Sequence, residues 1–214
     1  MSRPVSLSAS HSLPLRTQTP GRWARAVLAE PLALLNDHAF LEKKAANNAL
    51  DLLTKWPEPG VEGWAQVMTD IARDEALHLS QVHRLLTRRG GRLQRMHKNP
   101  YANALRLLVR KGAGPAEMVD RLLVSALIEL RSCERFSVLA TESQDSELAG
   151  FYQRLSTSER GHYLVFLKLA RAVDRPERVD HRWEELLEAE ARILGEQEFG
   201  PRIHSGLPPE SPCN

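Results

Sequence analysis

The sequence has little cysteine, no long apolar run and no glycine-rich nucleotide motif, and each absence removes a class of protein. Two cysteines in 214 residues suggest neither a disulfide framework nor a Cys-based metal site. No apolar run approaches the roughly 18 residues that span a bilayer, and the N-terminus lacks the compact apolar stretch of a secretory signal. The missing Gly-rich fingerprint argues against a built-in dinucleotide site. We therefore expect a cytoplasmic protein.

Acidic residues are also absent from one long segment. Between Glu75 and Glu117 there is none, while nine basic residues fall there: Arg84, Arg88, Arg89, Arg92, Arg95, Lys98, Arg106, Arg110 and Lys111. The segment from 174 to 198 is, by contrast, rich in acids. The formal net charge of +2 therefore conceals a strongly asymmetric distribution of charge along the chain.

Helical periodicity is present almost throughout, and no stretch alternates as a strand. With 42% hydrophobic and 26% charged residues, the chain has enough apolar side chains for one globular core. Residues 1–20 and 200–214 are rich in Ser, Thr, Pro or Gly without an apolar period, and we expect flexible tails there. The sequence thus predicts an all-α domain over residues 21–199.

Breakers and apolar stripes divide this domain into four long helices. Proline and glycine clusters at 57–60, 90–91 and 114–115 separate the first three, and a turn at 143–145 separates the last two. The predicted helices cover about 31–56, 61–89, 115–143 and from 146 onward, with a shorter acidic helix at about 180–195. Residues 99–112 should carry the chain along the bundle as a short crossing helix. The architecture expected is a ferritin-like four-helix bundle with a crossover and an extra C-terminal helix.

A Glu-x-x-His motif occurs on the second and the fourth long helix. The pairs are Glu75 with His78 and Glu159 with His162. On a helix, a separation of three places the carboxylate and the imidazole on one face, where both can reach one metal ion. A single copy is a weak signal, since such short motifs arise by chance.

The turn positions connect the two motifs. Helices joined by a short turn run antiparallel, so residues equally far from the turn lie at one height. The midpoint of Glu42 and Glu75 lies within Pro57-Glu58-Pro59-Gly60, and that of Glu129 and Glu159 falls on Gln144, inside the predicted turn. Each motif should therefore face a glutamate of the preceding helix. Glu134 competes with Glu129 for this role, but its midpoint with Glu159 lies beyond the turn, so we prefer Glu129.

Four glutamates and two histidines on apolar faces are costly without partners, and two divalent ions would satisfy all six. Carboxylates and imidazoles without thiolates suit iron or manganese. In the predicted site Glu75 and Glu159 bridge the ions, Glu42 and Glu129 are terminal, and His78 and His162 each bind one ion. Two ferrous ions could together supply electrons to reduce dioxygen. His38, one turn before Glu42, is either a partner of this glutamate or a capped or surface histidine.

At these positions the sequence resembles the tRNA methylthio-isopentenyl-adenosine hydroxylase family, a ferritin-like branch of the non-haem di-iron monooxygenases. The resemblance covers about residues 25–200, and its motifs are HAFLEKKAA at 38–46, DEALH at 74–78, NPYA at 99–102, ELRSCERF at 129–136 and SERGHY at 158–163. The ligand motifs alone indicate only the superfamily. Their combination with the linking segment favours this member.

The resemblance implies a tRNA-modifying enzyme that uses a di-iron centre and O2 to hydroxylate the isopentenyl side chain of a modified adenosine next to the anticodon. The same six residues would be the iron ligands: Glu42, Glu75, His78, Glu129, Glu159 and His162. The electrons would come from a separate reductase or donor, since the chain has no dinucleotide fingerprint or Cys cluster.

A tRNA substrate would also give the basic segment a use. Lys and Arg side chains neutralise phosphates, so Arg88, Arg89, Arg92, Arg95 and Lys98 are candidate RNA contacts. The alternative is a solvated, charged helix face. We expect no RNA contact from the acidic C-terminal helix.

Other functions are compatible with the same ligands. A ferritin-like oxidase or peroxidase acting on iron, peroxide or a small molecule would use the six ligands but would not need the basic loop, which we define as Arg88, Arg89, Arg92, Arg95 and Lys98. An iron storage or binding protein would use the six ligands without an organic substrate. A metal-free helical module would need neither ion. The long crossing segment and the basic loop favour the tRNA hydroxylase over a storage cage.

Overall fold

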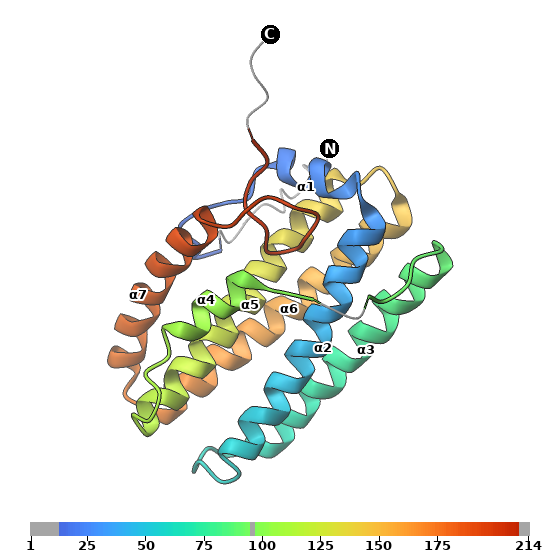
Figure 1. Cartoon of the computed structure of the whole chain (residues 1–214). Coiled ribbons are helices and arrows are strands. Elements are labelled where there is room, and N and C mark those ends of the chain that lie inside the picture. The colour runs from blue at the N-terminus through green and yellow to red at the C-terminus, as the bar shows by residue number, and fades with distance from the viewer. Residues whose placement is uncertain (1–12, 95–96, 210–214) are drawn as a thin grey trace, which may run out of the picture.

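The computed structural model describes residues 13–94 and 97–209, and within them the chain forms seven α-helices and no strand (Figure 1). This confirms the all-α prediction. The helices are α1 (Gly21–Leu28), α2 (Pro31–Lys55), α3 (Trp64–Arg88), α4 (Pro100–Leu107), α5 (Pro115–Glu142), α6 (Ser146–Val173) and α7 (Pro176–Gly195). In the described part of the chain, no helix is both long enough and apolar enough to cross a membrane.

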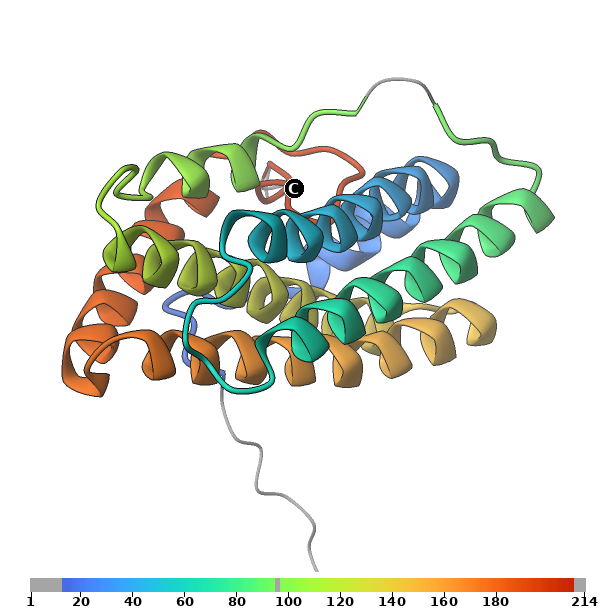
Figure 2. The ribbon, with the colours of Figure 1, turned by 90° about the horizontal axis from the view of Figure 1, so that it is seen from below.

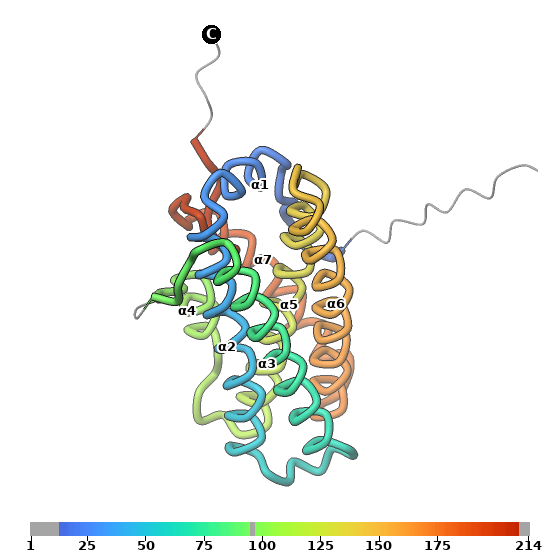
Figure 3. Tube along the Cα trace, turned by 90° about the vertical axis from the view of Figure 1, so that its right-hand side faces the viewer, coloured from blue at the N-terminus to red at the C-terminus, as the bar shows by residue number. Residues whose placement is uncertain are grey.

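Two antiparallel hairpins make up the bundle. Helix α2 packs along α3, and α5 packs along α6, whereas close backbone approaches between these two pairs are few. Figures 1 and 3 show the four long helices running along a common axis. The hairpins are thus separate layers, and long side chains must fill the space between them.

Local sequence explains where the helices begin and end. Proline lies in the first turn of α2, α4, α5 and α7, where its missing N–H costs nothing. The side chain of Asp145 caps α6 by accepting from the backbone N–H groups of Glu147 and Leu148. Gly60 and Gly63 adopt positive φ in the turn between α2 and α3, a conformation that glycine enters without steric cost.

The connection from α3 to α5 crosses the bundle and contains α4, which packs on α5 and α7 (Figure 2). Asn99 caps α4 by accepting from the N–H of Ala102. The predicted crossing helix is therefore present. It places Tyr101 and Leu105, both fully buried, in the core beside α5.

A layer of polar residues divides the apolar core. One apolar cluster takes residues from the C-terminal half of α2, the N-terminal half of α3, the N-terminal half of α5 and the C-terminal half of α6. The other takes residues from the opposite halves of these helices together with α1. Between the two clusters lie the buried glutamates and histidines that the sequence analysis singled out.

The chain segments beside the helical domain differ from the flexible tails expected from composition. Residues 1–12 and 210–214, which fall in those tails, lie outside the described residues. Thr19, by contrast, is buried, and so are Ile203, His204 and Ser205. The segment after α7 returns to α1, where the indole of Trp23 donates to Ser205 Oγ over 3.0 Å. Helix α1, which the sequence analysis did not separate from α2, helps to cover this end of the bundle.

Candidate metal centre

All four long helices contribute to a buried polar layer at the middle of the bundle. Glu42 comes from α2, Glu75 and His78 from α3, Glu129 from α5, and Glu159 and His162 from α6. Each is at most 7% exposed. The structure thus brings together the six residues that turn midpoints and motif spacing had predicted to meet.

The six residues form two overlapping groups. Glu42, Glu75, His78 and Glu159 make one group, and Glu75, Glu129, Glu159 and His162 make the other; in each group one ligand atom per residue lies within 4.8 Å of all the others. Glu75 and Glu159 belong to both groups. This sharing has the pattern expected of bridging carboxylates between two ions.

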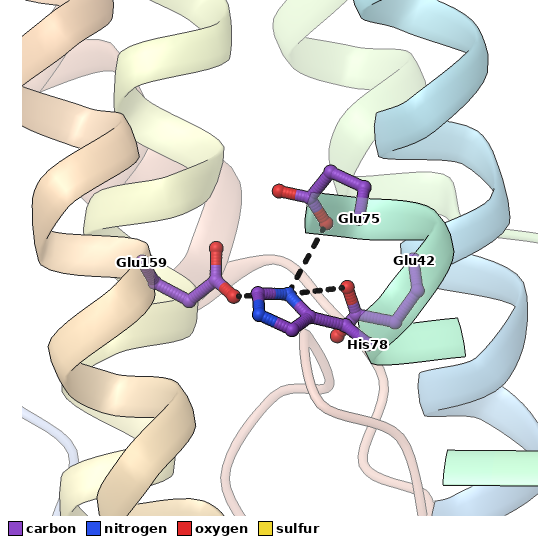
Figure 4. Close-up of side chains that lie close together, drawn as sticks. All are labelled: Glu42, Glu75, His78 and Glu159. Carbon is purple, nitrogen blue, oxygen red and sulfur yellow. Dashed lines mark ion pairs between the residues drawn. The ribbon is translucent and has the colours of Figure 1, made fainter. Parts of the chain in front are cut away.

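The shared carboxylates direct one oxygen towards each histidine. Nδ1 of His78 lies 3.8 Å from Glu75 Oε2 and 3.3 Å from Glu159 Oε1. Nδ1 of His162 lies 2.7 Å from Glu75 Oε1 and 3.4 Å from Glu159 Oε2. Figure 4 shows the first group, in which His78 also faces Glu42 over 3.6 Å. The two imidazoles approach each other with ring centres 5.9 Å apart.

Six potential metal-ligand atoms of this layer make no hydrogen bond within the described residues. Both carboxylate oxygens of Glu75 and of Glu159 are buried without a hydrogen-bond partner, and so is Nδ1 of both His78 and His162. Buried polar atoms are normally satisfied, so six such atoms in one place need an external partner. Four carboxylates and two divalent ions would balance in charge. The residues therefore fit a pair of metal ions.

Electrostatics supports the same conclusion. Burial, together with the nearby charge of Glu159, raises the pKa of Glu75 to about 8. Burial also raises the pKa of Glu42 and of Glu129. For His162, burial would lower the pKa, but Glu159 and Glu75 outweigh it and raise the pKa to about 10. In the metal-free cluster, bound protons offset the negative charge of the carboxylates. Metal ions would compete with these protons for the same oxygen and nitrogen atoms.

His38 lies directly behind Glu42 and not on the surface. It is fully buried, and its Nε2 lies 2.5 Å from Glu42 Oε1. Burial lowers the pKa of His38 to about 3, so the ring is neutral, and an ionised Glu42 accepts this hydrogen bond from it. Aromatic rings enclose it, with ring centres 4.7 Å away for Phe136 and 5.6 Å away for Tyr152. Of the two sequence-based alternatives for His38, the partner of Glu42 is the one observed.

Glu134, the rival of Glu129, points elsewhere. Its carboxylate accepts from the backbone N–H and the hydroxyl of Thr19 and from Arg131 NH1, which lies 3.1 Å from Oε2. It belongs to neither of the two groups of potential ligands. The structure therefore places Glu129, and not Glu134, in the polar layer.

The predicted RNA contacts do not gather at this layer. Arg88 lies 2.5 Å from Glu147, and Arg89 lies 2.7 Å from Asp145 and 2.9 Å from Glu147, so acidic residues at the start of α6 already neutralise both. Arg92 and Lys98 are exposed. Arg95 lies outside the described residues.

A pocket reaches the polar layer from the side of α2, α4 and α5. Its walls include Glu42, Glu75, Glu129 and Glu159, and its other lining residues include Lys44, Ala45, Asn48, Asn99, Arg106, Ser125, Ile128, Ser132, Phe136 and His204. Apart from the four glutamates, sequence reasoning assigned none of these polar wall residues to a pocket. Only the spacing of Asn48 and Ser125, each one or two turns from a ligand-layer glutamate, could have indicated them.

Comparison with known proteins gives a consistent result. The family model described as tRNA-(MS[2]IO[6]A)-hydroxylase (MiaE) matches residues 7–205. A Pseudomonas putida protein named tRNA 2-(methylsulfanyl)-N(6)-isopentenyladenosine(37) hydroxylase is 40% identical over 190 residues, which cover 89% of this chain and 91% of that protein. A Salmonella typhimurium protein of the same name is 30% identical, covering 91% of this chain and 88% of that protein.

A solved structure is also similar. The Synechococcus protein titled "Protein 43 with aldehyde deformylating oxygenase activity" matches with a TM-score of 0.84 and 33% identity, over 90% of this chain and 96% of that one. The ferritin-like helical fold predicted from the sequence is thereby confirmed. The matches cover both hairpins and the connection between them.

Proposed function

Because the chain belongs to the tRNA-(MS[2]IO[6]A)-hydroxylase family, we propose that it hydroxylates the isopentenyl side chain of methylthio-isopentenyl-adenosine next to the anticodon of tRNA, using two iron ions and O2. The chain is a tRNA-modifying hydroxylase, as the resemblance at the sequence level implied. The observation that carries the di-iron part of the proposal is the set of buried, unpartnered carboxylate oxygens and imidazole nitrogens on α3 and α6, within a cluster to which all four long helices contribute.

We assign the ligands by the two overlapping groups. Glu42 and His78 would hold one iron, Glu129 and His162 the other, and Glu75 and Glu159 would be shared. The ligand set contains oxygen and imidazole nitrogen without sulfur, which suits iron or manganese. A pair of ferrous ions supplies the electrons and the oxygen-activating chemistry that hydroxylation of an unactivated C–H bond needs.

The protein's own side chains orient the ligands and limit access of water. His38 donates to Glu42 Oε1 and so fixes the direction in which Oε2 is presented to His78. Phe136 and Ile128 line the pocket beside the carboxylates. An apolar wall next to the reacting centre suits an apolar side chain and excludes solvent.

A further component would come from outside the chain. Since the sequence has neither a dinucleotide fingerprint nor a Cys cluster, a separate reductase or other donor would deliver the electrons. The site of action would be the cytoplasm, where tRNA is modified.

The proposal is tested by mass spectrometry of tRNA nucleosides from cells that lack the protein. The hydroxylated nucleoside should disappear and its unhydroxylated precursor should accumulate, and the wild-type gene should restore the product. A matched pair of variants, Glu129→Ala and Glu134→Ala, completes the test, since only the second should restore it. Persistence of the hydroxylated nucleoside in the deletion strain would exclude this substrate.

The structural neighbour provides a second comparison. Its title reports aldehyde deformylating oxygenase activity, so the purified, iron-loaded protein should be assayed with an aldehyde and with the tRNA substrate in parallel. We expect turnover of the tRNA alone. Turnover of the aldehyde alone would favour the ferritin-like oxidase alternative on a small substrate.

A further inference from the structure

The pocket beside the polar layer changes character from its inner end to its mouth. Ala45, Ala102, Ile128 and Phe136 contribute apolar surface near the carboxylates. Two further hollows adjoin it and share with it Asn48 and Arg106. Five cations and one carboxylate line these outer hollows: Lys44, Lys55, Arg106, Lys111 and Arg121, with Asp51.

The free volume follows the same gradient. About 40 Å³ is free in the inner pocket, whereas the outer hollows have about 400 Å³ and about 170 Å³. A narrow apolar end that opens into a wide, cationic mouth matches a ligand with a slender apolar group on a bulky, anionic body. A prenylated nucleotide within an RNA chain has this form.

Arg106 is the cation at the centre of this mouth, since it lines all three hollows. Its side chain is exposed, and within the described residues that side chain makes no hydrogen bond or ion pair. Burial of part of the group and the nearby charge of Arg121 lower the pKa of Arg106. Arg106 and Arg121 repel each other, and Asp51 in the same hollow offsets only part of this repulsion, so an anionic ligand would be attracted here.

Lys44 has a similar position on α2. Its Nζ lies 2.8 Å from Nδ1 of His97, whose Nε2 lies 2.6 Å from Asp37 Oδ1. The imidazole thus orients Lys44 without pairing it to a carboxylate. Arg121 completes the group from α5, although Glu117 accepts from its Nε over 2.9 Å.

The basic loop differs from this mouth in two respects. Arg88 and Arg89 are paired with Glu147 and Asp145, so an RNA phosphate would have to displace a carboxylate. Neither residue lines the pocket that leads to the polar layer. Unpaired charge that is continuous with the pocket is therefore found on α2 and α4, at Lys44 and Arg106, whereas Arg121 of α5 shares Glu117 with Lys55.

We propose that Lys44, Arg106 and Arg121 bind the phosphates that flank the modified adenosine, and that its isopentenyl group enters the pocket towards Glu75 and Glu129. The inference rests on the proposed function and adds the RNA-binding surface to it. Phosphate contacts position the substrate, while the apolar pocket selects the side chain. Three contacts on single-stranded RNA would account for a slope of about −2 in log binding constant against log salt concentration.

The test uses the iron-loaded, full-length protein and an anticodon stem-loop that carries methylthio-isopentenyl-adenosine. Arg106→Gln, Lys44→Gln, Arg121→Gln and the triple variant are compared with the control Arg88→Gln. We expect the triple variant to bind about tenfold or more weakly at physiological salt and to lose about two units of salt slope. KM should rise while kcat at saturating stem-loop stays within about twofold.

Arg106→Gln is the cleanest single variant, because its guanidinium makes no contact that folding needs. Its iron content and thermal unfolding should equal those of the wild type. If the wild type hydroxylates the stem-loop and the triple variant binds it equally well, the mouth is not the RNA-binding surface and the proposed function stands. Loss of binding in Arg88→Gln alone would assign that role to the basic loop. A wild-type protein that neither binds nor hydroxylates the stem-loop would contradict the proposed function itself.

Discussion

Two buried acidic clusters lie on neighbouring turns of α5, and they differ in what neutralises them. Around Glu129 the other members are glutamates and histidines, and six of their polar atoms have no hydrogen bond within the described residues. Around Glu134, by contrast, Arg131 donates to Glu134 over 3.1 Å and to both oxygens of Glu190 over 2.8 and 2.9 Å. Tyr101 also donates to Glu190.

The difference separates a structural cluster from a ligand-binding one. A buried carboxylate that accepts two hydrogen bonds from a guanidinium has its charge neutralised. The pair of Arg131 with Glu190 in this way connects α5 to α7. A buried carboxylate that faces other carboxylates keeps an unneutralised negative charge until it binds a cation. Residue type and burial are the same at Glu129 and Glu134, so the partners alone decide their roles.

The largest effect should come from removing a shared carboxylate. Glu159→Ala takes a ligand from both groups, so we expect loss of both irons and a fall in hydroxylation of about a thousandfold or more. Metal analysis and a turnover assay measure this. Glu134→Gln is the control and should keep two irons per chain. If Glu159→Ala retained two irons, the cluster around Glu129 would not be the metal site, and its contrast with the cluster around Glu134 would fail.

The next effect concerns stability alone. Arg131→Met leaves Glu190 buried without its cation and Glu134 with Arg135 alone, whose Nε lies 3.8 Å away. Breaking such a buried pair costs about 3–5 kcal/mol of unfolding free energy. Denaturant unfolding of the iron-loaded protein measures it. Iron stoichiometry should stay unchanged. A variant that folds normally but loses iron would show that the two clusters act as one.

A smaller effect is expected from the residue behind Glu42. His38→Leu keeps the apolar packing but removes the donor to Glu42, which should weaken iron binding about 10- to 100-fold. Competition with a chelator gives the affinity. Tyr152→Phe is the matched control, because the Tyr152 hydroxyl has no hydrogen-bond partner within the described residues. Equal affinities for the two variants would argue against an orienting role for His38.

The smallest effect should have opposite signs in the two clusters. Without metal, Glu129→Gln removes a carboxyl group whose pKa burial and Glu75 raise, so we expect a gain on the order of 1 kcal/mol in unfolding free energy. Glu134→Gln replaces a carboxylate that is hydrogen-bonded to Thr19 and Arg131, so the unfolding free energy should fall by about 1–3 kcal/mol. Urea unfolding in the presence of a chelator tests both. Changes of the same sign would contradict the contrast.

The sequence predicted the bundle and the meeting of six residues because both follow from local rules. Helix periodicity, prolines in first turns and the positions of the two hairpin turns bring Glu42 level with Glu75 and Glu129 level with Glu159. Their assignment as metal ligands remains a prediction. Metal analysis of the variants above is what tests it.

Other features depend on contacts that no local pattern encodes. The alternative between Glu129 and Glu134 is explained by Thr19, 115 residues away in sequence from Glu134. The pairing of Arg88 with Glu147 joins residues 59 apart, so a count of charges along the chain overstated how much of the basic loop is free. Ile203 and His204 are buried although their segment has the composition of a flexible tail.

The polar layer that divides the apolar core also bears on how the folded chain opens. Each hairpin is held by its own packing, while the middle of the contact between hairpins consists of groups that repel one another until cations bind. Local opening should therefore begin there in the metal-free protein, and amide hydrogen exchange at the centres of α2, α3, α5 and α6 should slow markedly on loading with iron. The same transient separation would give the ions a route to His78 and His162, which do not line the pocket that reaches the glutamates.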